Sequence, residues 1–343
     1  MAVRTHLNTL FVLTEDTYLS KEGEAVVVKQ GDAKPLRVPI HMLSGVVLLA
    51  QARMSPYLMA LCADRDVAVS FLDSKGRFLA RVEGRTSGNV LLRKSQFRAA
   101  ETPQQALLLA RSFVQGKIHN CRMVLGRSVR DHGDDTGLVG SASQHLARCL
   151  KKAGMAQDVD ALRGIEGEAA RHYFAAFPSL VRSTDPALAM KGRTRRPPKD
   201  PVNALLSFAY AILSLDARSA CETVGLDPQV GFLHADRPGR VSLALDLAEE
   251  FRAVIADRVV LSLLNRQQIT GDGFEWDEGG AVRLKDDARK TFLGEYQRRK
   301  HEELKHPFLG DKITLGLAPF LQARLIARAL RGDMDGYPPF LWH

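Results

Sequence analysis

The hydrophobic pattern of this chain changes about one hundred residues from its start, and this change divides the fold into two parts. Before that point, short β-branched runs are separated by turn-forming residues. The clearest runs are LFVL at 10–13, AVVVK at 25–29, GVVLLA at 45–50 and VAVSFLD at 67–73. Runs of this length and spacing predict a sheet or small sandwich. One helix is expected among them at 55–64, because Ser55 can cap it and Pro56 suits its first position.

From Thr102 onward the pattern becomes helical. The segment TPQQ at 102–105 has the form of a capping box, with Pro at the first helical position and Gln at the third, and ALLLARSFVQGKI follows it. A chain of 343 residues is also long for a single core. We therefore predict an α+β protein with a small N-terminal β-sandwich-like domain at 1–90, a linker at 91–101 and a larger all-α domain at 102–343.

The charge balance favours a polyanionic partner such as nucleic acid. There are 48 Lys and Arg against 39 Asp and Glu, a formal charge of +9. Five basic residues gather in the loop KGRTRRPPKD at 191–200, whose prolines prevent it from continuing a helix. An ordinary solvated loop is the alternative to contact with the DNA backbone. The candidate contacts are Lys191, Arg193, Arg195, Arg196 and Lys199.

Cysteine spacing and hydropathy indicate the compartment. The four cysteines lie far apart without a C-x-x-C pair, which argues against a thiolate zinc site and gives no disulfide framework. We find no run of about 18 apolar residues that would span a bilayer, and no signal-peptide pattern at the start. These features predict a cytoplasmic protein with no membrane partner.

The helix expected at 159–177 carries a carboxylate on its apolar stripe. Glu166 lies beside Ile165, Ala169 and Tyr173, which follow the helical period. A buried carboxylate is costly unless it is neutralised, paired or bound to a metal. A salt bridge to a neighbour such as Arg163 or Arg171 is one interpretation, and metal binding is the other.

A second group of candidate ligands lies between 225 and 257. The helix expected from Ser242 presents three carboxylates within two turns, and such close like charges raise one another's pKa unless a cation lies among them. These are Asp246, Glu249 and Glu250. His234 lies in the preceding glycine-containing loop, which can fold back over the helix start. A solvent-facing acidic helix is one interpretation; the other is a Mg²⁺ or Mn²⁺ site for phosphoryl chemistry.

Four segments together resemble the motif blocks of a known family. They are GIEGEAARHYF at 164–174, PVNALLSFAYAILS at 201–214, GLDPQVGFLH at 225–234 and LALDLAEEFRAVIAD at 243–257. Their order and spacing are similar to those of the CRISPR-associated spacer integrase, the first Cas protein, and most similar to type I-C members. The resemblance covers nearly the whole chain, including a basic loop between the first two blocks.

The resemblance implies which residues form the site. The family's three metal ligands fall on Glu166, His234 and Glu249. Asp246 then lies beside them as a nearby carboxylate, and Arg252 matches a basic position near the DNA backbone. On the residues alone, Glu250 competes with Glu249 for the third ligand position. Many family members have Asp at that third position, where this chain has Glu.

The resemblance also implies an activity and partners. It implies a divalent-metal-dependent DNA endonuclease and integrase that inserts spacer DNA into the repeat array by attack of a 3′-hydroxyl on a phosphodiester. The implied partners are double-stranded and branched DNA, a second copy of the chain joined through the β-domain, and a small second Cas protein. A Cas exonuclease is a further candidate partner. Two other classes remain open: a non-catalytic helical DNA-binding scaffold, and a metal hydrolase of small phosphorylated substrates.

Overall fold

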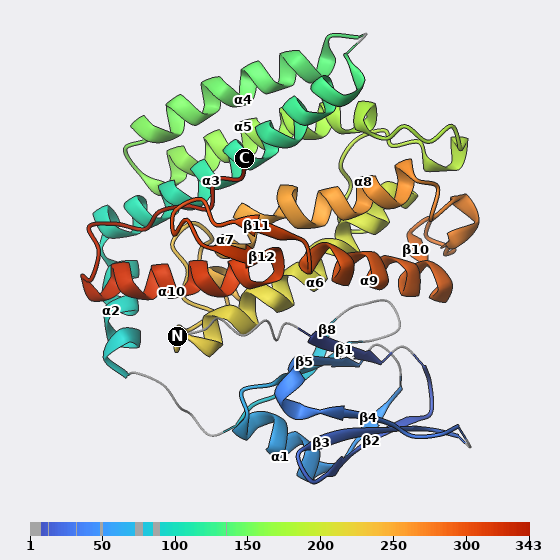
Figure 1. The fold of residues 1–343 in the computed structure, drawn as a ribbon. Helices are drawn as coiled ribbons and strands as arrows, with labels where there is room; N and C mark the ends of the chain where they lie inside the picture. Colours follow the sequence, from blue (N-terminus) through green and yellow to red (C-terminus); the bar gives the residue numbers. More distant parts are fainter. Residues whose placement is uncertain are drawn as a thin grey trace. The chain divides into compact units, whose positions relative to one another are not determined.

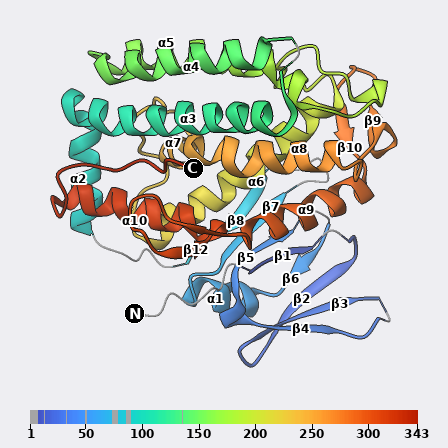
Figure 2. The same ribbon diagram turned by 45° about the horizontal axis from the view of Figure 1, so that its top comes forward.

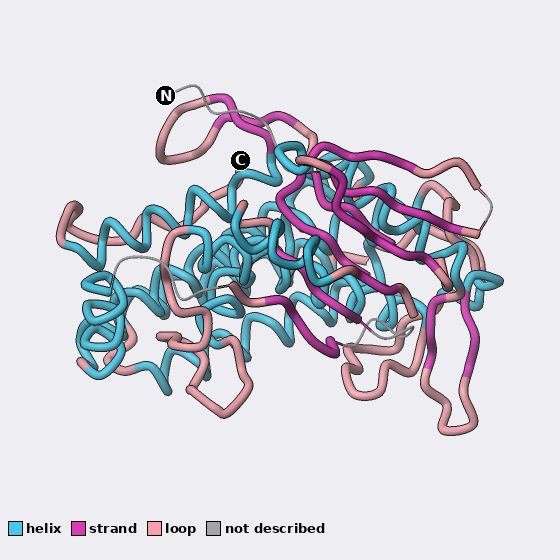
Figure 3. Tube along the Cα trace, turned by 90° about the horizontal axis from the view of Figure 1, so that it is seen from below, coloured by secondary structure: helices cyan, strands magenta, loops and turns pink. Residues whose placement is uncertain are grey.

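The computed structural model describes residues 8–12, 14–31, 33–48, 51–72, 78–84, 90–134 and 136–343 (Figure 1). The chain divides into two compact units, Met1–Ser87 and Gly88–His343. The first unit contains most of the strands and the second contains most of the helices, as the magenta and cyan segments of Figure 3 show. The predicted α+β class, with a β-rich part before a larger helical part, is confirmed.

The first unit contains two four-stranded sheets. One has the strand order β1 (Asn8–Val12), β5 (Leu43–Leu48), β7 (Ala68–Leu72), β8 (Phe78–Val82). The other has the order β4 (Leu36–Pro39), β3 (Ala25–Gln30), β2 (Thr17–Glu22), β6 (Arg53–Met54). The pairs β1–β5, β5–β7 and β2–β6 are parallel, and the remaining neighbours are antiparallel. Residues 13, 49–50 and 73 of the expected strands lie outside the described residues.

Both sheets share one hydrophobic core. Val46 and Val69 reach it from one sheet, while Leu19 and Val26 reach it from the other. Leu58 adds to this core from α1 (Pro56–Asp64), and its N–H donates to Ser55 Oγ at 3.2 Å. The cap expected at this helix is therefore present. The shared core agrees with the sandwich-like arrangement expected from the short β-branched runs.

The second unit begins with a helix at residues 91–101, where a linker was predicted. Residues 91–101 belong to α2 (Val90–Glu101), so the linker assignment is wrong there. Leu92, Gln96 and Ala99 are buried at helical spacing, while the charged residues between them lie on the other face. Gln96 also donates to the carbonyls of Asp227 and Val230, both at 2.8 Å. The charged composition marked the outer face of an amphipathic helix rather than a solvated connection.

Three long helices pack side by side after α2 (Figure 2). They are α3 (Pro103–His132), α4 (Leu138–Met155) and α5 (Val159–Ala176). Helix α3 starts at Pro103 as expected, but the Thr102 hydroxyl donates to the Arg98 carbonyl at 2.8 Å instead of capping α3. The Thr102 hydroxyl therefore bonds to the last turn of α2, although the capping-box pattern predicted that it would cap α3.

The next helices carry the C-terminal half of the motif blocks. They are α6 (Pro201–Thr223), α7 (Ser242–Phe251), a π-helical turn (Arg252–Asp257) and α8 (Arg258–Asn265). Among the described residues, α6 is the one helix long and apolar enough by composition to cross a membrane, although polar residues interrupt its apolar sequence. It packs against α7, α8 and α10, and more than half of its apolar window is buried.

The remaining helices and hairpins close the second unit. Its last helices are α9 (Asp286–Lys300) and α10 (Ala318–Arg331). Two short hairpins pair β9 (Phe274–Trp276) with β10 (Val282–Leu284), and β11 (Glu303–Lys305) with β12 (Lys312–Thr314). Short 3₁₀ turns lie at Ile40–Met42, Phe177–Leu180, Pro186–Leu188, Gly271–Gly273 and Leu315–Leu317. All four cysteines are buried and free.

Candidate active site

The loop before α7 is folded around one buried carboxylate. Asp246 on α7 is fully buried, and its oxygens accept hydrogen bonds from the backbone N–H groups of Phe232 (2.7 Å), Leu233 (3.0 Å) and His234 (3.0 Å). Gly231 permits this approach, because a Cβ there would lie 2.7 Å from the Cβ of Ser242. The loop therefore folds back over the start of the helix, and Asp246 fixes its position.

Asp246 also orients the imidazole of His234. The Nδ1 atom of His234 lies 2.6 Å from Asp246 Oδ1, so a proton on Nδ1 satisfies that contact. The Nε2 atom faces the other way and lies 3.8 Å from Glu249 Oε1. A carboxylate that holds the far nitrogen of an imidazole is the usual support of a metal-binding histidine.

A buried lysine connects the other two candidate ligands. Lys117 on α3 pairs with Glu166 Oε1 on α5, and its Nζ lies 2.7 Å from Glu249 Oε2 on α7. Burial by itself would lower the pKa of Lys117, but the charges of Glu249 and Glu166 outweigh it and raise that pKa. The ammonium group therefore stays charged and links three helices.

Glu166 forms its salt bridge with Lys117 and not with Arg163 or Arg171. Arg163 instead lies 2.5 Å from Asp160 and donates to the carbonyl of Leu233 at 2.6 Å. A second cation joins the cluster through Arg252, whose Nη1 lies 2.8 Å from Glu249 Oε1. Burial favours the neutral form of Glu249, but Arg252 and Lys117 outweigh it and lower its pKa to about 2. Glu249 is therefore ionised at neutral pH.

Glu250, the competing third ligand, points to a different set of partners. Its Oε1 accepts from the Tyr337 hydroxyl at 2.7 Å, and its Oε2 accepts from the Phe340 N–H at 2.7 Å and Gln322 Nε2 at 3.2 Å. Burial raises its pKa to about 8. The structure therefore separates two adjacent glutamates that the helix pattern placed on one face, and only Glu249 lies with Glu166 and His234.

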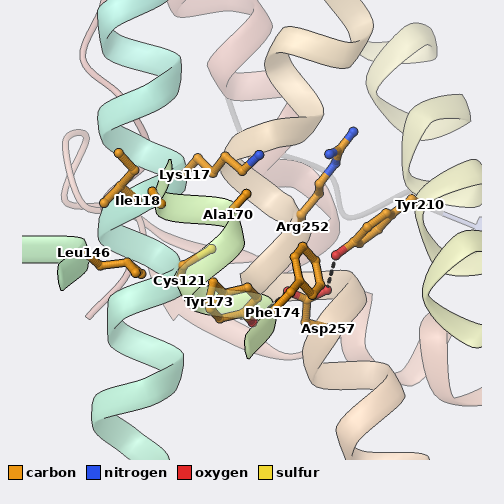
Figure 4. A pocket seen from close by; sticks show the side chains of 11 residues that line it. Lys117, Ile118, Cys121, Leu146, Ala170, Tyr173, Phe174, Tyr210, Arg252 and Asp257 are labelled. Atoms are coloured by element: carbon orange, nitrogen blue, oxygen red, sulfur yellow. Dashed lines mark hydrogen bonds between the residues drawn. The ribbon is translucent and has the colours of Figure 1, made fainter. Parts of the chain in front are cut away.

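Asp257 ends the π-helical turn beside the same cluster. Its carboxylate accepts hydrogen bonds from the hydroxyls of Tyr173 (2.8 Å) and Tyr210 (2.6 Å), and burial raises its pKa to about 6. The Arg252 guanidinium lies 4.8 Å from the ring centroid of Tyr210, the residue whose hydroxyl reaches Asp257 (Figure 4). These groups, together with Lys117, line a cavity of about 10 Å³, which is room for a single water.

Comparison with known proteins identifies the family. The family model described as CRISPR associated protein Cas1 matches residues 10–298, most of the chain. The chain belongs to the Cas1 family. It is 52% identical over 342 residues to a CRISPR-associated endonuclease Cas1 of Chlorobaculum tepidum, covering 99% of this chain and 100% of that protein. A Cas1 endonuclease of Rhodospirillum rubrum is also 52% identical, covering 98% of each chain.

Solved structures share the Cas1 fold. A CAS1 protein from Thermotoga maritima has a TM-score of 0.81 at 21% identity, covering 95% of this chain and 97% of that one. A casposase bound to its integration product has a TM-score of 0.82 at 22% identity, covering 98% and 93%. The two-part architecture described above is therefore the Cas1 architecture.

Lys117 is a site residue of this Cas1 chain that was not among those predicted from the sequence. Its signal is the same as that of Glu166: a charged residue at a position of the apolar stripe of a helix, seven residues before Val124 and four after Phe113. Lys117 also affects the predicted metal site. Among the described residues, no group of three His, Cys, Asp or Glu side chains is arranged to hold a metal ion, and the Lys117 ammonium contacts both Glu166 and Glu249.

The basic loop of this Cas1 chain contains two kinds of residue. Arg193 turns inward: it donates to Asn203 Oδ1 at 2.7 Å and lies 5.4 Å from the ring centroid of Tyr210. The other four side chains are exposed. They are Lys191, Arg195, Arg196 and Lys199. Arg193 therefore anchors the loop to α6, and the remaining four are free to reach a polyanion.

Proposed function

We propose that this protein performs the integration step of CRISPR adaptation with a divalent ion, Mg²⁺ or Mn²⁺, held by Glu166, His234 and Glu249. The observation that carries the proposal is that His234 lies 3.8 Å from Glu249, while Lys117 joins Glu249 to Glu166. Membership of the Cas1 family, whose relatives are named endonucleases, supports a nuclease and integrase. It also disfavours a non-catalytic scaffold and a hydrolase of small phosphorylated substrates.

The donor atoms suit a divalent ion. Glu249 Oε2 is buried without a hydrogen bond, although it contacts the Lys117 ammonium, and Asp246 leaves Nε2 of His234 available. Two carboxylates and one imidazole match the ligand preferences of Mn²⁺ and leave positions for water and phosphate oxygens. Binding an ion between Glu166 and Glu249 requires Lys117 to leave at least one of them, which its long side chain allows.

The residues of the chain divide the work of strand transfer. A bound divalent ion would supply Lewis acidity at the scissile phosphodiester. Asp246 keeps His234 in one tautomer and one orientation, and Arg252 keeps Glu249 ionised. Lys117 and Arg252, which both contact Glu249, would stabilise the negative charge that builds up on the phosphorane oxygens. The attacking 3′-hydroxyl releases its proton as its oxygen forms a P–O bond, the P–O bond to the leaving 3′-oxygen breaks, and that oxygen takes up a proton. With water as nucleophile, the same site cleaves DNA.

Partners and subtype complete the proposal. The DNA substrates are double-stranded and branched, and the exposed basic loop is the proposed backbone clamp. A related chain, 24% identical with a TM-score of 0.81, is part of a Cas6-RT-Cas1–Cas2 complex, and a Geobacter sulfurreducens relative, 36% identical, is a Cas4 exonuclease–Cas1 fusion. We therefore propose a small second Cas protein and a Cas4-type exonuclease as partners, a homodimer joined through the β-domain, action in the cytoplasm, and a type I-C affiliation.

The test is strand transfer onto branched DNA in the presence of Mn²⁺. We expect activity in the wild type and a loss of at least about 100-fold in His234→Ala. His301→Ala is the matched control, because His301 is exposed at the end of α9, and it should keep wild-type activity. Equal activity in the wild type and His234→Ala would contradict the proposed site.

A further inference from the structure

A second cavity lies farther along the helix that carries Lys117. It has a volume of about 200 Å³ and is formed between the C-terminal part of α3, the turn at Leu180 and α8. A single water needs only about 10 to 15 Å³ by this measure, so the cavity has room for a larger polar group. Polar lining residues include Ser128 on α3 and Ser262 on α8.

The cavity gathers positive charge that the described residues only partly neutralise. Arg127, Arg258 and Arg266 line it, against the single carboxylate of Asp131, whose Oδ2 lies 3.3 Å from Arg127 Nε. In the part of the chain that the structure describes, neither Arg258 nor Arg266 forms an ion pair. The Nε of Arg258 is buried without a hydrogen-bond partner, and its guanidinium lies 5.3 Å from the ring centroid of Trp342.

This arrangement has an electrostatic cost. Burial, together with the neighbouring charges of Arg299 and Arg127, lowers the pKa of Arg258 to about 10. A buried donor without an acceptor is also unfavourable. An anion in the cavity would offset both effects, and guanidinium groups recognise phosphate through paired hydrogen bonds.

The cavity continues the face of α3 that carries Lys117. Val124, Ser128 and Asp131 follow Lys117 by 7, 11 and 14 residues, and these steps return to the same side of an α-helix. Val124 is therefore about 10 Å and Asp131 about 21 Å from Lys117 along the helix axis. Arg258 likewise follows Arg252 by six residues along the chain. Both walls of the cavity thus extend elements of the candidate active site.

We propose that this cavity binds a backbone phosphate of the DNA strand held at the active site, about three to six phosphates from the reacting one. That interval is the distance along α3 divided by a rise of about 3.4 Å per phosphate, for a duplex that runs parallel to this helix. The inference rests on the proposed function, because it assumes that DNA reaches the Glu166, His234 and Glu249 site. The occupant is a phosphodiester rather than an acidic protein segment, because the cavity lies in line with that site.

The test compares two charge-matched double variants. Arg127→Gln with Arg266→Gln removes two exposed arginines at the cavity, and Arg324→Gln with Arg328→Gln removes two exposed arginines of α10, which does not line it. Branched DNA labelled with fluorescein is titrated at several salt concentrations. Loss of one phosphate contact should reduce the slope of log K against log salt by about 0.9 in the cavity variant only. Arg258→Gln provides a second variant inside the cavity.

Neutral methylphosphonates locate the contact. We expect that one neutral linkage, about three to six positions from the branch point, weakens DNA binding by the wild type and by the α10 variant. The same linkage should not weaken binding by the cavity variant, because that variant has already lost the contact. Equal slopes in the two double variants, or additive effects at every linkage, would overturn the inference. So would unchanged DNA binding with lost capture of the second Cas protein, because the cavity would then hold a protein carboxylate. If the wild type itself neither binds nor joins DNA, the proposed function fails as well.

Discussion

Glu249 and Glu250 are adjacent glutamates, both buried, in opposite electrostatic environments. Glu249 is 2% exposed and lies between the cations of Lys117 and Arg252, which hold its pKa at about 2. Glu250 is fully buried among neutral donors from the C-terminal segment, and burial raises its pKa to about 8. Burial alone therefore does not mark a functional carboxylate. The charge of the neighbouring groups decides whether the carboxylate is an anion ready for a metal or a protonated anchor.

The contacts around Glu250 help to position Glu249, because both residues lie on α7. The Asn120 side chain on α3 donates to the carbonyls of Glu250 (2.7 Å) and Phe340 (2.8 Å). Gly116 on α3 allows close packing here, because a Cβ would lie 3.0 Å from Glu250 Cγ. The next residue is Lys117, which reaches the other side of α7. The anchor at Glu250 thus holds the helix at the distance from α3 that the Lys117 contact with Glu249 requires.

Neutralising each glutamate in turn should have very different effects on activity. Glu249→Gln removes the proposed ligand and should lower Mn²⁺-dependent strand transfer by at least about 100-fold. Glu250→Gln keeps the shape and an acceptor for the Phe340 N–H, so activity at pH 7 should stay within a few-fold of the wild type. Similar losses in both variants would show that the two carboxylates act together and that the division is wrong.

The pH dependence of stability should have opposite signs at the two residues. Since the folded-state pKa of Glu250 is raised from 4.5 to about 8, it contributes stability that is complete below pH 4.5 and is lost as the pH rises through 8. The slope is at most about 1.4 kcal/mol per pH unit, and Glu250→Gln should abolish it. The pKa of Glu249 is lowered, so its contribution is present above pH 4.5 and is lost as the pH falls towards 2. Urea unfolding of protein treated with EDTA measures both.

Lys117→Met tests whether the ammonium group stands in for an ion. Without metal, the variant leaves Glu166 and Glu249 without their shared cation and should lose about 2 kcal/mol of stability, discounted because Glu166 is partly exposed. Its melting temperature should then rise more with added Mn²⁺ than that of the wild type, because no ammonium has to leave. A smaller rise than in the wild type would show that Lys117 supports metal binding instead of competing with it.

The smallest effect on stability and activity is expected for Tyr337, which donates a hydrogen bond to Glu250. Tyr337→Phe removes one hydrogen bond to Glu250 and should cost about 1 kcal/mol of stability. Because that hydroxyl lowers the pKa of Glu250, its removal should raise the pKa further. Strand transfer should be unchanged. A large loss of activity in Tyr337→Phe would mean that the anchor controls the position of Glu249 closely.

The sequence predicted the parts of this molecule that depend on local pattern. Strand runs, the Ser55 cap and the start of α7 depend on neighbouring residues, and the structure contains them. The α2 helix was mistaken for a linker because its charged outer face hid three buried positions. Residues far along the chain decide the rest. Glu250 differs from Glu249 because of Tyr337 and Phe340, about ninety positions later, which no helix pattern of 243–257 contains.

The π-helical turn at Arg252–Asp257 makes this region intolerant of changes in length. It joins α7, which carries Glu249, to α8, which carries Arg258, and π turns are frequent at functional sites. Deleting one residue would turn α8 by about 100° relative to α7. Asp257 would then lose its alignment with Tyr173 and Tyr210, and Arg258 its place at the second cavity, although no side chain had been replaced. Substitutions in this segment can be neutral, whereas the loss of one residue cannot, because it rotates the helix that follows.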